Sequence, residues 1–224
     1  MTGLERNLKY WFSYVGKSIG QIYLMIVGIV AVMSFLDGSD FLMTFSKNLV
    51  MYLVMASAMS IMVFGFSNIT IIFPTTVSFS SKRSTSLIGM TVAQHVMCIL
   101  SFAVAFVFGL YIEPNFRPMA GPAIPVVLGG ICFLFFIGNI MAVLSDRFGR
   151  TLGMVLYMLF VFALVFVIVF GYNYLAGGKG EALVQALFTN LGAASVIICA
   201  LGVLLDVIGV WILAAGIKNK DLKF

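Results

Sequence analysis

The chain has 224 residues, of which 62% are hydrophobic and only 9% are charged, and its net charge is +5. Soluble domains carry roughly a quarter of charged residues, so this composition excludes an ordinary soluble globular protein. The positive charge has a sufficient cause in the flanks of the apolar runs and does not indicate nucleic-acid binding. The composition predicts an all-α integral membrane protein.

Residues 1–17 come before the first apolar run and mix apolar and charged side chains. The apolar positions are Leu4, Leu8, Trp11, Phe12 and Val15, and Glu5, Arg6, Lys9 and Ser13 lie between them. This helical spacing predicts an amphipathic helix in the headgroup layer. The alternative is that these residues simply begin a tilted first span. The charged start does not match a removable signal peptide, so we expect the first span to be retained.

Six apolar runs are long enough to cross a hydrocarbon layer of about 30 Å, which takes about 20 helical residues. The predicted transmembrane helices cover residues 18–36, 48–73, 87–112, 122–144, 151–175 and 191–217. They form one predicted domain over residues 18–217, followed by a basic tail at 218–224. An even number of spans places both termini on the same side.

Lys and Arg are distributed unevenly between the two ends of these spans. The side of the termini holds ten, Arg6, Lys9, Lys17, Lys82, Arg83, Arg147, Arg150, Lys218, Lys220 and Lys223, and the other side holds three, Lys47, Arg117 and Lys179. Cationic flanks stay in the cytoplasm during insertion. The prediction is therefore a multi-pass protein of the cell (cytoplasmic) membrane with both termini cytoplasmic.

The segment between the second and third spans, residues 74–86, is rich in hydroxyl side chains. These are Thr75, Thr76, Ser78, Ser80, Ser81, Ser84, Thr85 and Ser86. Hydroxyls suit helix caps and turns, and Val77 and Phe79 add apolar anchors. The pattern predicts a short cytoplasmic helix that is available to a partner protein.

The same region resembles a known family. Phe73 and Pro74, the run 78–83 (SFSSKR), and Ile88 with Gly89 are similar to the "FP…SFGSTRK…IG" segment of small bacterial ABC transporter permeases of the type-2 exporter class. The sequence departs from that pattern at Ser80, where a glycine is usual, and in the order of its two cations. The resemblance also covers the overall plan of an interfacial N-terminal helix, six spans and a basic tail.

This resemblance implies that the segment is a coupling helix that docks into a cytoplasmic ABC ATPase subunit. The resemblance assigns this coupling role to Phe79, Ser80, Ser81, Lys82, Arg83 and Ser84. The chain itself lacks a G-x-x-x-x-G-K-[ST] phosphate loop. We therefore expect no cofactor on this chain and no enzymatic activity by itself, with ATP and Mg bound by the partner ATPase. A second permease copy, or a related permease, would complete the transport path.

In the resembling family the second and fifth spans face each other across the dimer. Here these spans carry methionines at helical spacing, namely Met51, Met55, Met59, Met62, Met154 and Met158. Methionine adapts to irregular apolar partners. The predicted translocation path therefore suits hydrophobic or amphipathic compounds such as drugs or antimicrobial peptides. The alternative is that the methionines only pack the helices.

Two ionisable residues fall deep within the spans. Asp206 lies twelve residues before Lys218, which places it about 18 Å from the inner flank. A carboxylate at that depth costs roughly 2.5 to 3.5 kcal/mol, so it needs a partner. His95 lies at a comparable depth, and we predict a His95–Asp206 pair, with Gln94 as a further candidate member. The pair acts either as a proton-linked or gating switch or as a polar contact that fixes helix register.

Smaller signals complete the sequence-based prediction. Gly202, Gly209 and Gly216 share a helical face with Asp206, which predicts close helix packing and an inward carboxylate. Asn68 and Asn139 are expected to bridge helices or cap bends. Residues 181–190 predict an outer helix before the last span.

Three other functions stay open at the level of sequence. An intramembrane enzyme would need a nucleophile or metal cluster, and the chain has one histidine and neither an HExxH nor a GxSxG motif. The membrane subunit of a vitamin importer would need a polar outer cavity. A transport-inactive sensor or immunity subunit would share the same plan.

Overall fold

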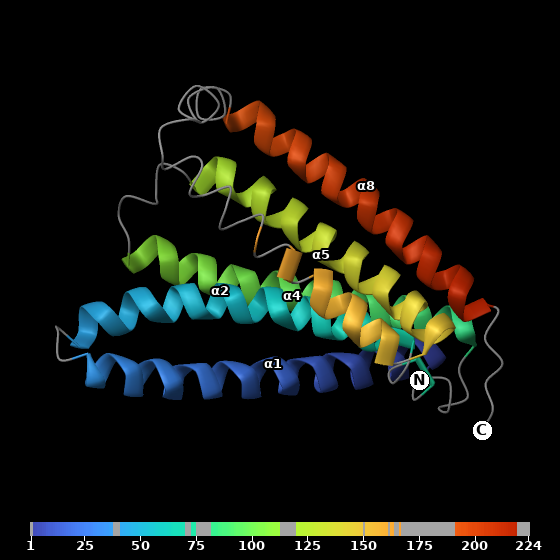
Figure 1. Ribbon diagram of the computed structural model, residues 1–224, viewed down its shortest axis with the longest axis horizontal. Coiled ribbons are helices and arrows are strands. Elements are labelled where there is room, and N and C mark those ends of the chain that lie inside the picture. Colours follow the sequence, from blue (N-terminus) through green and yellow to red (C-terminus); the bar gives the residue numbers. More distant parts are fainter. Residues whose placement is uncertain are drawn as a thin grey trace.

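The computed structural model describes residues 2–37, 41–69, 73–74, 82–112, 120–149, 151–160, 162–163, 166 and 191–218. The described residues contain five long helices and no strand (Figure 1). The long helices are α1 (Gly3–Leu36), α2 (Phe41–Ser67), α4 (Arg83–Ile112), α5 (Ala120–Phe148) and α8 (Leu191–Lys218). A shorter apolar helix covers Thr151–Phe160.

Each of the five long helices is long and apolar enough to cross a membrane, so the described residues confirm the prediction of a helical protein with several candidate membrane spans. They coincide with five of the six predicted spans. The fifth predicted span, 151–175, is described as a helix only over Thr151–Phe160. The count of six therefore stays a prediction. The predicted outer helix at 181–190 and the tail beyond residue 218 lie outside the described residues.

The N-terminal segment and the first span form one continuous helix. Thr2 caps α1 in a reciprocal arrangement: its N–H donates to Glu5 Oε2 at 2.7 Å, and the Glu5 N–H donates to Thr2 Oγ1 at 3.3 Å. The structure shows no break near residue 17. Trp11 is buried in the main core, at 1% exposure, rather than turned outward. Residues 3–17 are therefore not set apart as a helix of their own, and the placement of the predicted helix in the headgroup layer stays a prediction.

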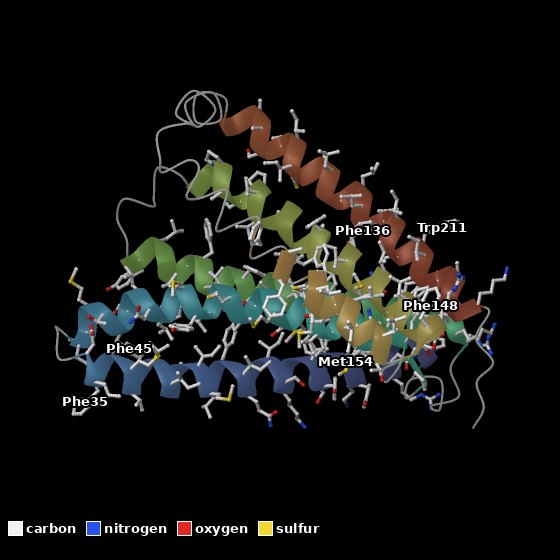
Figure 2. The ribbon with its side chains drawn as sticks, viewed as in Figure 1. Phe35, Phe45, Phe136, Phe148, Met154 and Trp211 are labelled. Carbon is white, nitrogen blue, oxygen red and sulfur yellow. The ribbon has the colours of Figure 1, made fainter. Side chains whose placement is uncertain are left out.

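The helices form one bundle in which α1 packs on α2 and α4, while α5 packs on α2 and α8 (Figure 1). We call one end of this bundle the basic end, because it holds Lys82, Arg83, Arg147 and Lys218. α1 begins and α8 ends there. Figure 2 shows Trp211 pointing away from the bundle on the last turns of α8.

Glycines set the closest helix crossings. A Cβ atom on Gly65 of α2 would lie 2.7 Å from the Cα of Gly138 on α5. On α8, a Cβ atom on Gly209 would lie 2.9 Å from the Cα of Phe136. Such contacts let two backbones approach directly, as small residues do in membrane proteins. The predicted glycine face of α8 is thus confirmed as its contact with α5.

The short helix Thr151–Phe160 lies against α5 and α2. A Cβ atom on Gly153 would lie 2.7 Å from the Cα of Ser145 on α5. The rings of Phe66 and Tyr157 have centroids 5.5 Å apart. This placement brings the start of the predicted fifth span beside the second within one chain, whereas the methionine prediction concerns contacts between two chains and stays untested.

Candidate functional site

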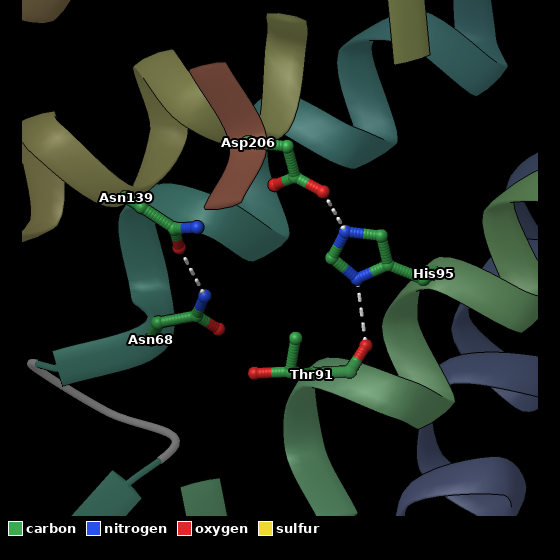
Figure 3. Close-up of polar contacts among 5 residues, drawn as sticks. All are labelled: Asn68, Thr91, His95, Asn139 and Asp206. Atoms are coloured by element: carbon green, nitrogen blue, oxygen red, sulfur yellow. Dashed lines mark hydrogen bonds and ion pairs between the residues drawn. The ribbon is translucent and has the colours of Figure 1, made fainter. Parts of the chain in front are cut away.

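His95 on α4 and Asp206 on α8 meet inside the bundle (Figure 3). Nε2 of His95 lies 2.7 Å from Oδ2 of Asp206, and Nδ1 lies 2.8 Å from the carbonyl oxygen of Thr91. Asp206 is only 9% exposed. The pairing that was predicted from matched depths is therefore confirmed.

The hydrogen-bond geometry of the pair limits where its protons lie. The Thr91 carbonyl can only accept, so Nδ1 of His95 must carry a proton. The contact between Nε2 and Oδ2 holds one further proton, on either atom. The pair is then either imidazolium with carboxylate or neutral imidazole with carboxylic acid. Both arrangements have no net charge, which is the state that an apolar interior tolerates.

An aromatic ring and a groove surround the pair. The ring of Phe135 on α5 stacks on His95 with centroids 4.0 Å apart and an interplanar angle of 16°. Oδ1 of Asp206 is buried and has no hydrogen-bond partner among the described residues. A groove of about 400 Å³ runs between α4 and α8; it is lined by Thr91, Val92, His95, Val96, Asp206, Val207 and Val210.

A second polar group joins three helices through buried amides. Nε2 of Gln94 on α4 donates to Oδ1 of Asn68 at 2.7 Å, and Nδ2 of Asn68 donates to Oδ1 of Asn139 on α5 at 3.0 Å. All three side chains are buried. Asn68 lies in a wide π-helical turn that follows α2. The bridging role of Asn68 and Asn139 is confirmed.

The same contacts correct the prediction for Gln94. We expected it as a candidate member of the His95–Asp206 pair, but it binds Asn68 instead. The physical reason is the helical turn: adjacent residues point about 100° apart, because a turn takes 3.6 residues. Gln94 therefore faces α2 while His95 faces α8.

A hydroxyl cluster that sequence reasoning missed ties α1 to α2 and α4. The Tyr23 hydroxyl donates to the carbonyl oxygen of Ser101 at 2.9 Å and lies 2.8 Å from Oγ of Ser57. The two serine hydroxyls are 2.7 Å apart. The only signal was a tyrosine and two serines inside apolar runs. That signal is weak, because a serine hydroxyl within a helix can donate to the backbone carbonyl four residues earlier. Ser57 also donates to the carbonyl oxygen of Leu53 in this way.

The methionines are split between the surface and the core. Met51, Met55 and Met59 are exposed on α2, and Met154 and Met158 are exposed on the short helix. Met62 is only 6% exposed, whereas Met59 is 61% exposed. The stripe is exposed as far as Met59 and is buried at Met62, near the Phe66–Tyr157 contact with the short helix.

A groove of about 590 Å³ between α1 and α2 is lined in part by Met25, Met55 and Met59. It does not include Met51, Met62, Met154 or Met158. The structure of the single chain therefore does not bring the six predicted path methionines around one cavity. Only Met55 and Met59 of the six line this groove.

The predicted coupling residues are described only in part. Lys82, Arg83 and Ser84 are exposed at the basic end, at the start of α4, and the carbonyl of Lys82 accepts from the N–H of Ser86 at 3.0 Å. Arg83 Nη1 donates to the carbonyl oxygen of Lys218 at 3.3 Å, which ties the start of α4 to the end of α8. Phe79, Ser80 and Ser81 lie outside the described residues.

No group of three or more metal-binding side chains occurs within the part of the chain that the structure describes. Comparison with known proteins gives no match to a family model, to a curated protein or to a solved structure. The permease resemblance therefore rests on the motif and the plan of the chain.

Proposed function

We propose that this chain is the membrane-spanning permease subunit of an ATP-driven exporter of hydrophobic or amphipathic compounds, placed in the cytoplasmic membrane with both termini inside. The observation that carries the proposal is the position of the coupling motif. Lys82, Arg83 and Ser84 are exposed at the basic end, where a cytoplasmic ATPase would approach. The resemblance of this motif to the permease segment indicates that the partner is an ABC ATPase subunit.

The contacts of α4 support a route from the ATPase into the bundle. α4 is one uninterrupted helix from Arg83 to Ile112, so a displacement at its first turn moves the whole helix. Arg83 is bonded to the end of α8, and Gln94, three turns further on, is bonded to Asn68 at the end of α2. A shift of α4 would therefore change its contacts with both neighbours, which is how an element with two positions couples distant sites.

The α1–α2 groove is the proposed entry to the transport path. Its walls are mainly apolar and include methionines, and Tyr14, Tyr52, Ser18 and Ser60 add a few hydroxyls. Such a mixture suits amphipathic ligands, which need apolar contact and a small number of polar anchors. The groove lies on the outside of the single chain, so a second permease copy would enclose it.

The first test is copurification in mild detergent from native membranes. We expect an ATPase with a phosphate loop to accompany the wild type and to be lost from Lys82→Glu/Arg83→Glu. The matched control is Arg147→Glu/Lys218→Glu, which makes the same charge change on exposed side chains of the same end of the bundle. This control should retain the ATPase. Absence of an ATPase from the wild type, or its retention by the Lys82/Arg83 variant, would overturn the proposal.

A further inference from the structure

The α4–α8 groove combines an ionisable floor with apolar walls. Val92, Val96, Val207 and Val210 form the walls, and Val207 is 64% exposed, so the groove is open from outside the chain. His95 and Asp206 lie at its floor. Oδ1 of Asp206 is a buried oxygen without a hydrogen-bond partner among the described residues, in a residue that is nine-tenths buried. An acceptor in this position is stabilised by any positive group that reaches it.

The pair can also become negatively charged by losing one proton. As it stands, the pair holds two protons between Nδ1, Nε2 and Oδ2 and has no net charge. Loss of one proton leaves neutral imidazole, still donating to Thr91, beside an ionised carboxylate. That state carries one negative charge in an apolar surrounding, which is unfavourable unless a cation compensates it.

The other groups that face the pair do not supply this compensation. From α5 the pair meets the Phe135 ring and the Cys132 thiol, which is near enough to Asp206 to interact with it electrostatically, and Cys199 of α8 lies in turn near Cys132. Thiols carry little charge at pH 7. Among the described residues that line the groove there is no lysine, arginine or second carboxylate.

We propose that this groove binds one lipophilic monovalent cation in exchange for one proton of the His95–Asp206 pair. The exchange balances: the neutral, doubly protonated pair and the cation give the singly protonated pair with its bound cation and one released proton. The proton leaves to the solvent, and no other reactant takes part. This site is distinct from the α1–α2 groove.

The walls select an organic cation over a metal ion. Mg²⁺ or Ca²⁺ takes six or more oxygen ligands, whereas this groove is lined by one carboxylate, one threonine, one histidine and four valines. A volume of about 400 Å³ falls in the range of small-molecule sites. A delocalised cation with apolar substituents would contact the valines and neutralise the carboxylate at the same time.

The test uses the purified full chain in phosphatidylcholine nanodiscs, without any ATPase, and radiolabelled tetraphenylphosphonium in equilibrium dialysis, with empty nanodiscs subtracted. We expect saturable binding of about one cation per chain. Tetraphenylborate has the same shape and the opposite charge, and it should not saturate. Because one proton leaves per cation, the Kd should rise about tenfold when the pH falls from 7 to 6.

Two variants separate the site from general effects on folding. Asp206→Asn should lose saturable binding, because an amide cannot take on the negative charge. Val207→Trp fills the open wall of the groove without removing the pair, and it should raise the Kd at least tenfold. The control is Leu201→Trp, on an exposed position of α8 that does not line the groove, which should bind as the wild type does.

Several results would overturn the proposal: equal binding of tetraphenylborate, a Kd independent of pH, or wild-type binding by Asp206→Asn or Val207→Trp. Absence of saturable binding by a folded wild type would do the same. Since no ATPase is present in the assay, none of these results bears on the exporter proposal, which depends on copurification.

Discussion

Gly129 of α5 and Gly202 of α8 lie in direct backbone contact. A Cβ atom on Gly202 would be 2.7 Å from the Cα of Gly129, and one on Gly129 would be 2.7 Å from the carbonyl oxygen of Ile198. These distances leave no room for a methyl group on either residue. The contact fixes how closely α8 approaches α5 and therefore how Asp206, four residues further along α8, is presented to α4.

Gly129→Ala is expected to destabilise the protein by about 1–3 kcal/mol, because its methyl group forces α5 and α8 apart. The neighbouring residue Gly130 provides a matched control, since a Cβ atom there meets nothing within 4 Å. Gly130→Ala should be neutral or stabilising by up to about 1 kcal/mol through its better helix propensity. Unfolding midpoints in nanodiscs would measure both. Equal midpoints for the two variants would contradict the packing described for this crossing.

The His95–Asp206 pair should show energetic coupling. His95→Leu and Asp206→Leu each leave the other group buried without its partner, whereas the double variant leaves neither. We expect the double variant to be more stable than the sum of the single effects predicts, by about 1–2 kcal/mol, near the upper values measured for membrane hydrogen bonds. A double-mutant cycle of unfolding free energies checks this. Additive single effects would mean that the contact contributes no net stability.

The amide chain should depend most on its middle member. Asn68→Leu removes one side chain but leaves two buried amides, Gln94 and Asn139, each without the hydrogen bond that it makes with Asn68. A cost of about 1–3 kcal/mol is expected for each unsatisfied group, so the loss should exceed that of most single substitutions. Ser67→Ala is the control, because the adjacent Ser67 hydroxyl bonds Val63 of its own helix. A midpoint for Asn68→Leu equal to that of Ser67→Ala would contradict this role.

The proposed second copy can be tested by disulfide formation. In a background without Cys98, Cys132 and Cys199, Met59→Cys should give a covalent dimer in most chains when membranes are treated with a membrane-permeant oxidant. Val107→Cys, which is similarly exposed on α4, serves as the control and should stay monomeric. Equal dimer yields from both positions would indicate random collision, and the α1–α2 face would then not be the dimer contact.

The predicted orientation has a direct readout. Ser84→Cys places a thiol among the exposed residues at the basic end. In the same cysteine-free background, a membrane-impermeant maleimide should label this thiol in inside-out vesicles at least tenfold more than in intact cells. Preferential labelling in intact cells would reverse the assignment of the termini to the cytoplasm.

The chain sequence determined by itself the features that depend on local composition. Apolar runs of about 20 residues locate five of the described helices, because a span has to satisfy its backbone hydrogen bonds internally. The glycines around Asp206 indicated which way its carboxylate points, and the cost of a buried charge required a partner at the depth of His95. The first expectation follows from one helix alone, and the second from the matched depths of two residues on different helices.

Only the tertiary structure decided the features that depend on how neighbouring helices are rotated and shifted. The sequence could not assign Gln94 to Asn68, since both His95 and Gln94 are polar and at the same depth. It could not separate the buried Met62 from the exposed Met59, because the spacing of the two fits one stripe and the burial comes from another helix. The Tyr23 cluster needs three helices to meet. The face of a helix follows from residue spacing along one segment. Most contacts between residues of different helices depend instead on how the helices pack, which the sequence alone does not determine.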